Sequence, residues 1–413
     1  MFTLIGSRHF GPLFATQFLG AFNDNLFKTS FIFMVTFRLA AGDPVRAAWL
    51  ATLAAGLFIL PFFLFSGPAG ALADARDKAA IARIVKIAEI AFMALGALGL
   101  WLESVPLCLT VLVLMGLHST VFGPIKYAIL PQHLAARDLV QGTGLVEGAT
   151  FVAILLGQIA GGLLPPDTAG PVAIAVAITG WLASRAIPPA PPETAGQAVD
   201  WNPWTSGRRA LREVITSREL LVATLCVSWF WALGAVFTTQ FVPLARNMLG
   251  GSEAVATLFL AAFSIGVAAG SALTHRLTHG AVSTRLCVWA GLAMAAAAAD
   301  LVFSVPVVGS APKDVAAFLT LPAGWRVLAD LTALATAGGI FSVPLYAVLQ
   351  TAPAADSRAR AIAANNIINA TFQVTAVLVI GAVIDASGNI AQVLAGTALT
   401  VIALIPLLRL LPR

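Results

Sequence analysis

The sequence predicts an all-α integral membrane protein with twelve transmembrane helices, and three observations support this prediction. Of the 413 residues, 59% are hydrophobic. Only 10% are charged, whereas a soluble domain carries about 25%. The mean hydropathy is +0.90, and long apolar runs recur with short polar connections between them. No stretch is long and polar enough to form a separate soluble enzyme, so we expect no enzymatic activity.

The apolar runs define the predicted helices in order. They lie at residues 12–39, 47–72, 80–102, 106–130, 139–164, 170–187, 220–244, 253–276, 283–305, 324–349, 360–384 and 390–411. These runs are too long and too uniformly apolar for the strands of a membrane β-barrel. The first run has polar residues and no small-residue cleavage site, so we interpret it as a retained helix rather than a signal peptide.

A polar stretch divides the helices into two groups of six. It begins with PPAPPETAGQ and ends in an arginine-rich piece. We therefore predict an N-terminal half at 1–187, a cytoplasmic linker at 188–219 on the membrane surface, and a C-terminal half at 220–413. With the N-terminus inside, seventeen Lys and Arg fall on the cytoplasmic side and five on the other. This asymmetry predicts that both termini are cytoplasmic.

The two halves resemble each other in sequence. FGPIKYAILPQ at 122–132 matches FSVPLYAVLQ at 341–350. Tyr127 and Tyr346 are the two tyrosines of the chain, and they occupy equivalent positions in this match. Because a shift of six helices preserves direction across the membrane, these are two parallel six-helix pseudo-repeats. This plan is typical of a transporter whose substrate site lies between the halves.

The first predicted helix carries a polar group of residues near its middle. Asn23, Asp24, Asn25 and Lys28 lie in GAFNDNLFK, and polar or charged side chains at that depth are costly unless they are paired or face water. Asp24 and Lys28 are four residues apart, so one interpretation is an internal pair that only neutralises the helix. The other is a polar face toward the central cavity, where Asp24 recognises a cationic group or a proton.

Lys126 lies about one turn from the cytoplasmic end of the fourth helix. It either snorkels to the interface or presents a fixed positive charge suited to phosphate. Glu147, two turns into the fifth helix, is a candidate partner. The repeat counterpart of Lys126 is the neutral Leu345, so the fold does not require a cation there.

The remaining charged residues within the runs have simpler interpretations. Glu89 lies one turn from Lys86, which suggests a structural ion pair. Asp300 and Asp330 fall near the outer ends of the ninth and tenth helices, where we expect solvated helix caps.

The eleventh helix carries a row of amides. Asn365, Asn369 and Gln373 recur on one face, with Asn366 alongside. They either hydrogen-bond between helices or form a polar wall opposite the first helix.

No catalytic, metal or cofactor chemistry is predicted. The five histidines are scattered, the three cysteines lie in apolar runs without CxxC spacing, and no P-loop motif occurs. The basic residues lie in short loops between apolar segments, so we expect no nucleic acid partner.

The loop GALADARDK at 70–78 resembles the signature loop of the major facilitator superfamily, with Asp77 in place of a later glycine. The resemblance implies that this loop is a conformational gate that holds the halves together on the cytoplasmic side. In particular, Asp74 is expected to meet the N-terminus of the eleventh helix. The gate residues implied are Gly70, Asp74, Arg76 and Lys78.

Three further motifs resemble the lysophospholipid transporter branch of that superfamily, which includes acyltransferase-fused members. They are QFLGAFNDNLFK at 17–28, FGPIKYAILPQHL at 122–134 and GLVEGATFVAILLGQIAGGLL at 144–164. The resemblance implies a flippase that moves a lysophosphatidylethanolamine-like lipid from the outer to the inner leaflet of a bacterial inner membrane by alternating access.

Carried over by position, Asp24 and Lys126 become headgroup contacts and Glu147 a cavity or gate residue. The seventh helix departs from relatives that carry an arginine there, so phosphate recognition rests on Lys126, with Lys28 as a possible second cation. The predicted substrate-binding residues are Asp24, Asn25, Lys28, Lys126, Tyr127, Glu147, Tyr346, Asn366, Asn369 and Gln373.

Two other functions fit the same sequence. One is a proton-driven exporter of amphipathic drugs or siderophores, with Asp24 as the proton carrier. The other is a non-transporting scaffold that docks an acyltransferase through the arginine-rich linker. For the flippase we expect a monomer in the lipid bilayer, with a separate acyltransferase to use the imported lipid.

Overall fold

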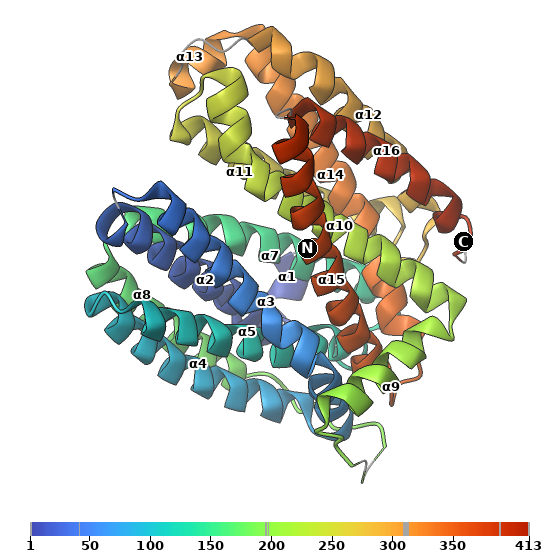
Figure 1. Ribbon diagram of the computed structural model, residues 1–413. Coiled ribbons are helices and arrows are strands. Elements are labelled where there is room, and N and C mark those ends of the chain that lie inside the picture. The colour runs from blue at the N-terminus through green and yellow to red at the C-terminus, as the bar shows by residue number, and fades with distance from the viewer. Residues whose placement is uncertain are drawn as a thin grey trace. The chain divides into compact units, whose positions relative to one another are not determined.

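The computed structural model describes residues 2–40, 42–194, 196, 198–308, 314–387 and 390–411. Lys313 and Arg413, which entered the orientation count, lie outside the described residues. The long helices follow the twelve predicted runs one for one (Figure 1). They are α2 (Gly11–Met34), α3 (Pro44–Ala75), α4 (Lys78–Trp101), α5 (Val105–Ala128), α7 (Ala136–Leu163), α8 (Pro166–Arg185), α10 (Arg218–Pro243), α11 (Glu253–Leu277), α12 (Arg285–Val308), α14 (Pro322–Thr351), α15 (Arg358–Ser387) and α16 (Ile390–Leu408).

Shorter helical segments connect them. They are α1 (Phe2–Ile5), α6 (Leu130–His133), α9 (Pro203–Ile215), α13 (Val315–Thr320) and the π-helical segments η1 (Val35–Leu39) and η2 (Leu244–Met248). The helix α9 lies inside the polar stretch that the sequence identified only as a linker.

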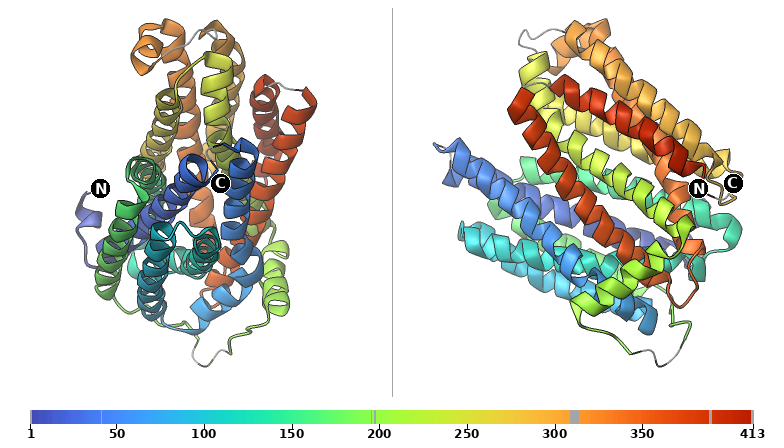
Figure 2. Two further views of the ribbon diagram at one scale, coloured as in Figure 1. Left: turned by 60° about the vertical axis from the view of Figure 1, so that its left-hand side comes forward. Right: turned by 45° about the vertical axis from the view of Figure 1, so that its right-hand side comes forward.

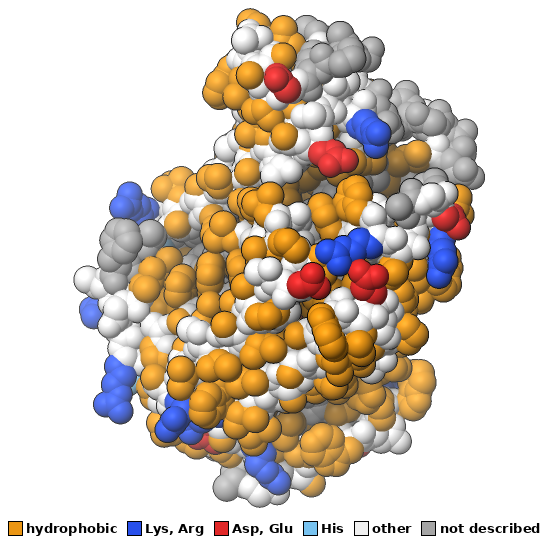
Figure 3. All heavy atoms as spheres, turned by 90° about the vertical axis from the view of Figure 1, so that its left-hand side faces the viewer, with side chains coloured by type: hydrophobic (Ala, Val, Ile, Leu, Met, Phe, Trp, Pro, Cys, Tyr) orange, Lys and Arg blue, Asp and Glu red, His pale blue; other side chains and the backbone are white. Residues whose placement is uncertain are grey.

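Nine of the long helices in the described part of the chain are apolar and long enough to cross a membrane. The helix α2 falls outside this group because its middle carries the polar residues from Asn23 to Lys28. The helix α8 is rich in small and weakly polar side chains, and the apolar stretch of α16 is the shorter Gln392–Leu408. Figure 3 shows one face of the molecule, on which apolar side chains cover most of the surface and charged ones are few.

The chain forms two compact units. The first comprises residues 1–142, 152–217 and 349–370, and the second comprises 143–151, 218–348 and 371–413. Three helices contribute to both. The middle of α7 belongs to the second unit, whereas residues 349–351 at the end of α14 and the first part of α15 belong to the first.

Helix packing within the units confirms the parallel repeat. In the first unit α8 packs against α2 and α4, and in the second α16 packs against α10 and α12, which are the helices six spans later (Figure 2). Glycines bring a further equivalent pair into contact. Gly116 of α5 lies against the Phe58 carbonyl of α3, while Gly270 of α11 lies against the Thr336 carbonyl of α14. The segments η1 and η2 also follow equivalent helices, α2 and α10.

Candidate functional site

A buried polar cluster lies among α2, α4 and α5 in the first unit. Its centre is the carboxylate of Glu89, which is fully buried. Asn23 donates from Nδ2 to Glu89 Oε1 at 2.9 Å, and Lys86 Nζ pairs with Glu89 Oε2. His118 Nε2 lies 3.1 Å from the same Oε2. Both carboxylate oxygens therefore have partners, as a charge buried within an apolar bundle requires.

Lys86 is the residue whose placement differs most from the sequence interpretation. The orientation count placed it among the basic residues of the cytoplasmic side, but it is 0% exposed within α4. A Cβ on Gly20 of α2 or on Gly180 of α8 would lie 3.1 Å from its Nζ. These two glycines leave the space that the ammonium fills, and Glu89 neutralises its charge. The predicted pair with Glu89 is confirmed.

Asp24 lies beside this cluster and is half-buried. Ser119 of α5, the neighbour of His118, donates from Oγ to Asp24 Oδ2 at 2.6 Å. The other oxygen, Oδ1, is buried without a hydrogen-bond partner among the described residues. The interpretation of Asp24 and Lys28 as an internal ion pair is not supported, because no ion pair within 4.0 Å joins the two side chains in the described part of α2, although the two charges interact electrostatically. Lys28 instead holds its Nζ 5.6 Å from the centre of the Phe58 ring.

Asn25 faces a different neighbour from Asp24. Its Nδ2 donates to the Ala21 carbonyl of its own helix at 2.8 Å, and its Cβ lies against Gly157 of α7. Gly161, one turn later, lies against the Leu26 carbonyl. The glycines of α7 thus form a close packing surface for α2, and the amide of Asn25 is already bonded to the backbone.

Lys126 lies on the face of α5 that carries Ser119. The two residues are seven apart, which is about two turns and about 10 Å along the axis. Lys126 is half-buried, and its Nζ lies 4.8 Å from the ring centre of the buried Tyr127. One face of α5 therefore presents, in order, the hydroxyl that holds Asp24 and the predicted phosphate contact.

The amides of α15 divide between the two units. In the first unit Asn365 is fully buried, and neither polar atom of its side chain has a hydrogen-bond partner among the described residues. The Nδ2 of Asn366 lies over Gly123 of α5. Asn369 is buried at 8% exposure, and Gln373, which belongs to the second unit, is half-buried. Asn366 thus packs against the helix that carries Lys126.

Two further predicted residues, Glu147 and Tyr346, belong to the second unit. Glu147 is fully buried in the middle of α7. Tyr346 of α14 is also buried, and its hydroxyl accepts a hydrogen bond from Trp231 Nε1 of α10 at 2.6 Å. The Trp231 ring stacks on Phe151 of α7 with 5.4 Å between centres. The indole and phenyl faces are suited to contact with an acyl chain.

The predicted contact between Asp74 and the start of the eleventh helix is present. Asp74 is buried at the end of α3 and accepts hydrogen bonds from the backbone N–H of Ala359 at 2.9 Å and of Arg360 at 3.1 Å. These are first-turn donors of α15, where the helix dipole favours an anion. Arg360 adds an ion pair at 3.5 Å. A Cβ on Gly70 would lie 2.6 Å from that of Ala363, so only glycine allows this approach.

The other two predicted gate residues make no direct bond to Asp74 in the described part of the chain, although the charge of Lys78 interacts electrostatically with it. Arg76 is exposed, and its Nη1 donates to the Ala75 carbonyl at 3.1 Å. Lys78 is buried, and its backbone N–H donates to the Ala190 carbonyl at 2.9 Å. The guanidinium that pairs with Asp74 therefore comes from Arg360 of α15 and not from the loop.

Asp300 and Asp330 of the second unit, which the sequence predicted to be solvated helix caps, have side-chain partners. Asp300 forms an ion pair with Arg326. Asp330 accepts a hydrogen bond from Ser304 at 2.9 Å. These acids therefore join α12 to α14, and the interpretation as simple solvated caps is incomplete.

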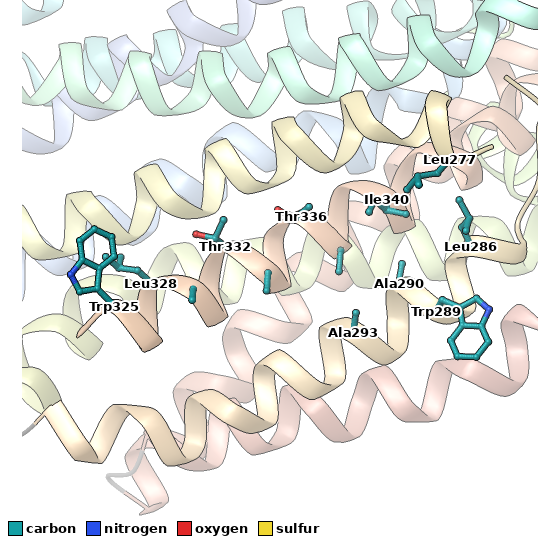
Figure 4. A pocket seen from close by; sticks show the side chains of 13 residues that line it. Leu277, Leu286, Trp289, Ala290, Ala293, Trp325, Leu328, Thr332, Thr336 and Ile340 are labelled. Carbon is teal, nitrogen blue, oxygen red and sulfur yellow. The ribbon is translucent and has the colours of Figure 1, made fainter. Parts of the chain in front are cut away.

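The second unit also contains a groove of about 760 Å³ between α12 and α14, closed at one end by Leu277 of α11 (Figure 4). Trp289 and Trp325 lie at its opposite ends, and small side chains such as Ala293 and Thr336 line it between them. None of the predicted substrate-binding residues lines this groove. Its apolar lining offers no charge for a headgroup.

Sequence reasoning missed three residues of the site: His118, Ser119 and Arg360. His118 could have been found, because an ionisable residue in the middle of an apolar span is a functional candidate by default. Its spacing relative to Glu89 has no sequence signature, since the two lie on different helices. No group of three His, Cys, Asp or Glu able to hold a metal occurs among the residues that the structure describes.

Comparison with known proteins supports a transport function. A family model described as Major Facilitator Superfamily matches residues 13–374. A relative from Enterobacter sp. (strain 638), named lysophospholipid transporter LplT, is 27% identical over 356 residues, covering 84% of this chain and 81% of the relative. A protein of the same name from Citrobacter koseri is 29% identical over 357 residues, with the same coverage.

Solved structures show the same fold. The human organic anion transporter MFSD10 (TETRAN) has a TM-score of 0.80 at 16% identity, covering 97% of this chain and 99% of that one. The transporter FucP in the outward conformation has a TM-score of 0.72 at 14% identity, covering 97% of each chain. At these identities the likeness concerns the fold alone.

The fold, the matched family model and the charged residues within the bundle define a multi-pass membrane transporter. The chain belongs to the Major Facilitator Superfamily. The curated relatives confirm the resemblance to the lysophospholipid transporter branch.

Proposed function

We propose that this chain moves a lysophospholipid, of the lysophosphatidylethanolamine kind, from the outer to the inner leaflet of a bacterial inner membrane by alternating access. The two relatives carry the name lysophospholipid transporter. A lysophosphatidylethanolamine has an ammonium, a phosphate and one acyl chain. A site for it therefore needs an anion, a cation and an apolar surface.

The observation that carries the proposal is the state of the Asp24 carboxylate. One oxygen is held by Ser119 and the other is buried without a partner among the described residues. A half-buried carboxylate with a free acceptor site in the middle of a membrane helix is suited to an ammonium group. The neighbouring Glu89 cannot take that role, because Asn23 and Lys86 already occupy its oxygens.

The cation and the apolar surface have candidates as well. Lys126 lies two turns from Ser119 on the same face of α5, and helical side chains lean toward the N-terminus, hence toward Ser119. It would contact the phosphate. Glu147 would act in the cavity or its gate, and the stacked rings of Trp231 and Phe151 are an apolar surface within the second unit.

The gate would be the contact of Asp74 with α15. Its two backbone hydrogen bonds and the Arg360 pair hold α3 to α15 on the side that the charge asymmetry assigns to the cytoplasm. Their breakage would open the site inward. We further propose cytoplasmic termini, division into halves at residues 188–219, a monomer, no catalysis by this chain, and a separate acyltransferase that uses the imported lipid.

A headgroup comparison tests the role of Asp24. Proteoliposomes with wild type, Asp24→Asn or Asp167→Asn would be assayed for flipping of lysophosphatidylethanolamine and of a lysophosphatidic acid, which lacks the ammonium. Asp167 is exposed at the start of α8, so its variant controls for loss of one negative charge. We expect Asp24→Asn to lower flipping of the ethanolamine lipid at least tenfold, since a charge-assisted hydrogen bond contributes about 1.5–3 kcal/mol.

The same assay separates the alternatives. Equal loss for both lipids would contradict an ammonium contact at Asp24. Proton-driven outward movement of other amphiphiles, with no lysophospholipid flipping by wild type, would favour the exporter. The scaffold would be favoured if Asp24→Asn and Lys126→Ala leave the phenotype unchanged and charge reversal in the linker abolishes it.

A further inference from the structure

The linker helix α9 is well defined at its start. Asn202 caps it by accepting from the backbone N–H of Trp204 at 3.0 Å, and its neighbour Asp200 accepts from the Thr205 hydroxyl at 2.6 Å. The Thr205 hydrogen bond lowers the pKa of Asp200 below its usual range. A capped start of this kind stabilises a short helix that would be marginal alone.

One side of α9 is fixed to the membrane-spanning helix α3 (Figure 1). Its buried residues are Ser206, Gly207, Ala210 and Val214. Gly207 lies directly against Gly67 of α3, so the two helices touch backbone to backbone. A glycine at 67 permits this contact because a Cβ there would clash with the backbone of Gly207.

This contact sets the depth of α9 relative to the membrane. The helix α3 has 32 residues. At about 1.5 Å per residue it is about 48 Å long, so a hydrocarbon core of about 30 Å leaves about 9 Å at each end. Gly67 lies eight residues before the end of α3 at Ala75, about 12 Å along the axis. The helix α9 is therefore held near the boundary between hydrocarbon and headgroups.

The uncovered surface of α9 has two adjacent faces. Trp204 and Ile215 share the face next to the buried one and are 80% and 59% exposed. Arg208, Arg209 and Arg212 follow on the side away from the buried face, and all three are exposed. No ion pair to any of them occurs in the described part of the chain, although Asp200 lies close enough to Arg209 to interact electrostatically.

We propose that α9 is an interfacial helix that binds anionic phospholipid on the membrane surface. Trp204 and Ile215 insert at the headgroup level, and the three arginines bind lipid phosphates. An apolar face beside a basic face, held in the plane of the interface, is the arrangement that binds anionic leaflets. This inference does not depend on which substrate the chain transports.

The apolar face favours a membrane over a partner protein. If α9 bound an acidic protein surface, the arginines would be needed. That function would not explain why Trp204 is 80% exposed at the depth of the lipid headgroups. Glu213 lies at the edge next to the buried face and leaves the basic face uninterrupted. The shape and charge of α9 therefore match a bilayer surface rather than an acyltransferase.

The test places a fluorescent probe on α9 in the full-length protein. The native cysteines Cys108, Cys226 and Cys287 are buried, so an Ile215→Cys variant can be labelled selectively at the surface. The labelled protein is placed in nanodiscs of phosphatidylcholine alone or with an equal amount of phosphatidylglycerol. Quenching by brominated lipid and by aqueous iodide then reports the depth of the probe, and native mass spectrometry counts retained phosphatidylglycerol.

The matched variants remove three arginines each. The test variant is Arg208→Gln with Arg209→Gln and Arg212→Gln. The control is Arg276→Gln with Arg285→Gln and Arg409→Gln, three exposed arginines of the second unit. Both variants lose three positive charges. They differ only in whether the arginines are removed from α9 or from the second unit.

We expect brominated lipid to quench the probe more strongly when the nanodisc contains phosphatidylglycerol, and less strongly when salt is added. Retained phosphatidylglycerol falls about tenfold or more in the α9 variant and little in the control, because each basic residue near an anionic surface adds to the attraction for lipid. Equal lipid retention by both variants would overturn the proposal. Quenching of the probe by aqueous iodide in both kinds of nanodisc would also overturn it. That result is expected if α9 binds a protein and not the membrane.

Discussion

At the residue scale, two neighbouring carboxylates in one membrane bundle, those of Glu89 and Asp24, have different environments. Glu89 is saturated by Asn23, Lys86 and His118, so its charge stabilises the fold. Asp24 keeps one buried oxygen without a partner among the described residues, so its charge remains available to a ligand. We propose that this difference in environment, and not the residue type, makes Glu89 a structural acid and Asp24 a binding acid.

The saturated pair predicts a large stability effect. Glu89→Gln leaves Lys86 buried without its counter-charge, and breaking a buried pair from one side costs about 3–5 kcal/mol. The measurement is the free energy of unfolding of the purified protein. Glu103→Gln is the control, because Glu103 pairs with Arg38 at the surface, where both side chains are about 40% exposed, and a surface pair contributes at most about 1 kcal/mol.

The double variant Lys86→Met with Glu89→Met sharpens this experiment. It removes both charges, so we expect it to recover most of the stability that Glu89→Gln loses. Similar losses for Glu89→Gln and Glu103→Gln would show that the buried pair has no special role.

At the element scale, the contact of α3 with α15 depends on glycine. Gly70 lets the helices approach until the Asp74 carboxylate reaches the first-turn N–H groups of α15. The resemblance of this loop to the superfamily signature implied the Asp74 contact, and the helix dipole favours an anion at such a place. It did not predict Arg360 as the partner, because a motif within one loop holds no information about side chains nearly three hundred residues away.

Gly70→Val should weaken the gate. A side chain at 70 clashes with Ala363 and forces α3 away from α15, so we expect the cytoplasmic side to stay open. A cysteine introduced at Ala363, which is fully buried, should then react several-fold faster with a membrane-impermeant maleimide. Gly56→Val on the same helix is the control, because a Cβ at Gly56 meets no atom within 4 Å. Equal reactivity in both variants would contradict this role of Gly70.

At the scale of the whole molecule, the sequence predicts the fold more completely than the site. Helix boundaries follow from apolar runs, and the observed helices begin and end within a few residues of them. The parallel repeat follows from one sequence match and recurs in the helix packing. The Glu89 cluster joins three helices, so no local pattern could have revealed it. The helix α9 was missed because its short, arginine-rich sequence lacks the long apolar run that marks a span.

The central claim is that the chain flips lysophospholipids, and one measurement tests it most directly. Labelled lysophosphatidylethanolamine would be followed across proteoliposomes that contain wild type, Asp24→Asn or Lys126→Ala, with and without a pH gradient. We predict flipping by wild type that does not require the gradient and that both substitutions abolish. No flipping by wild type, together with gradient-driven movement of other amphiphiles, would contradict the claim.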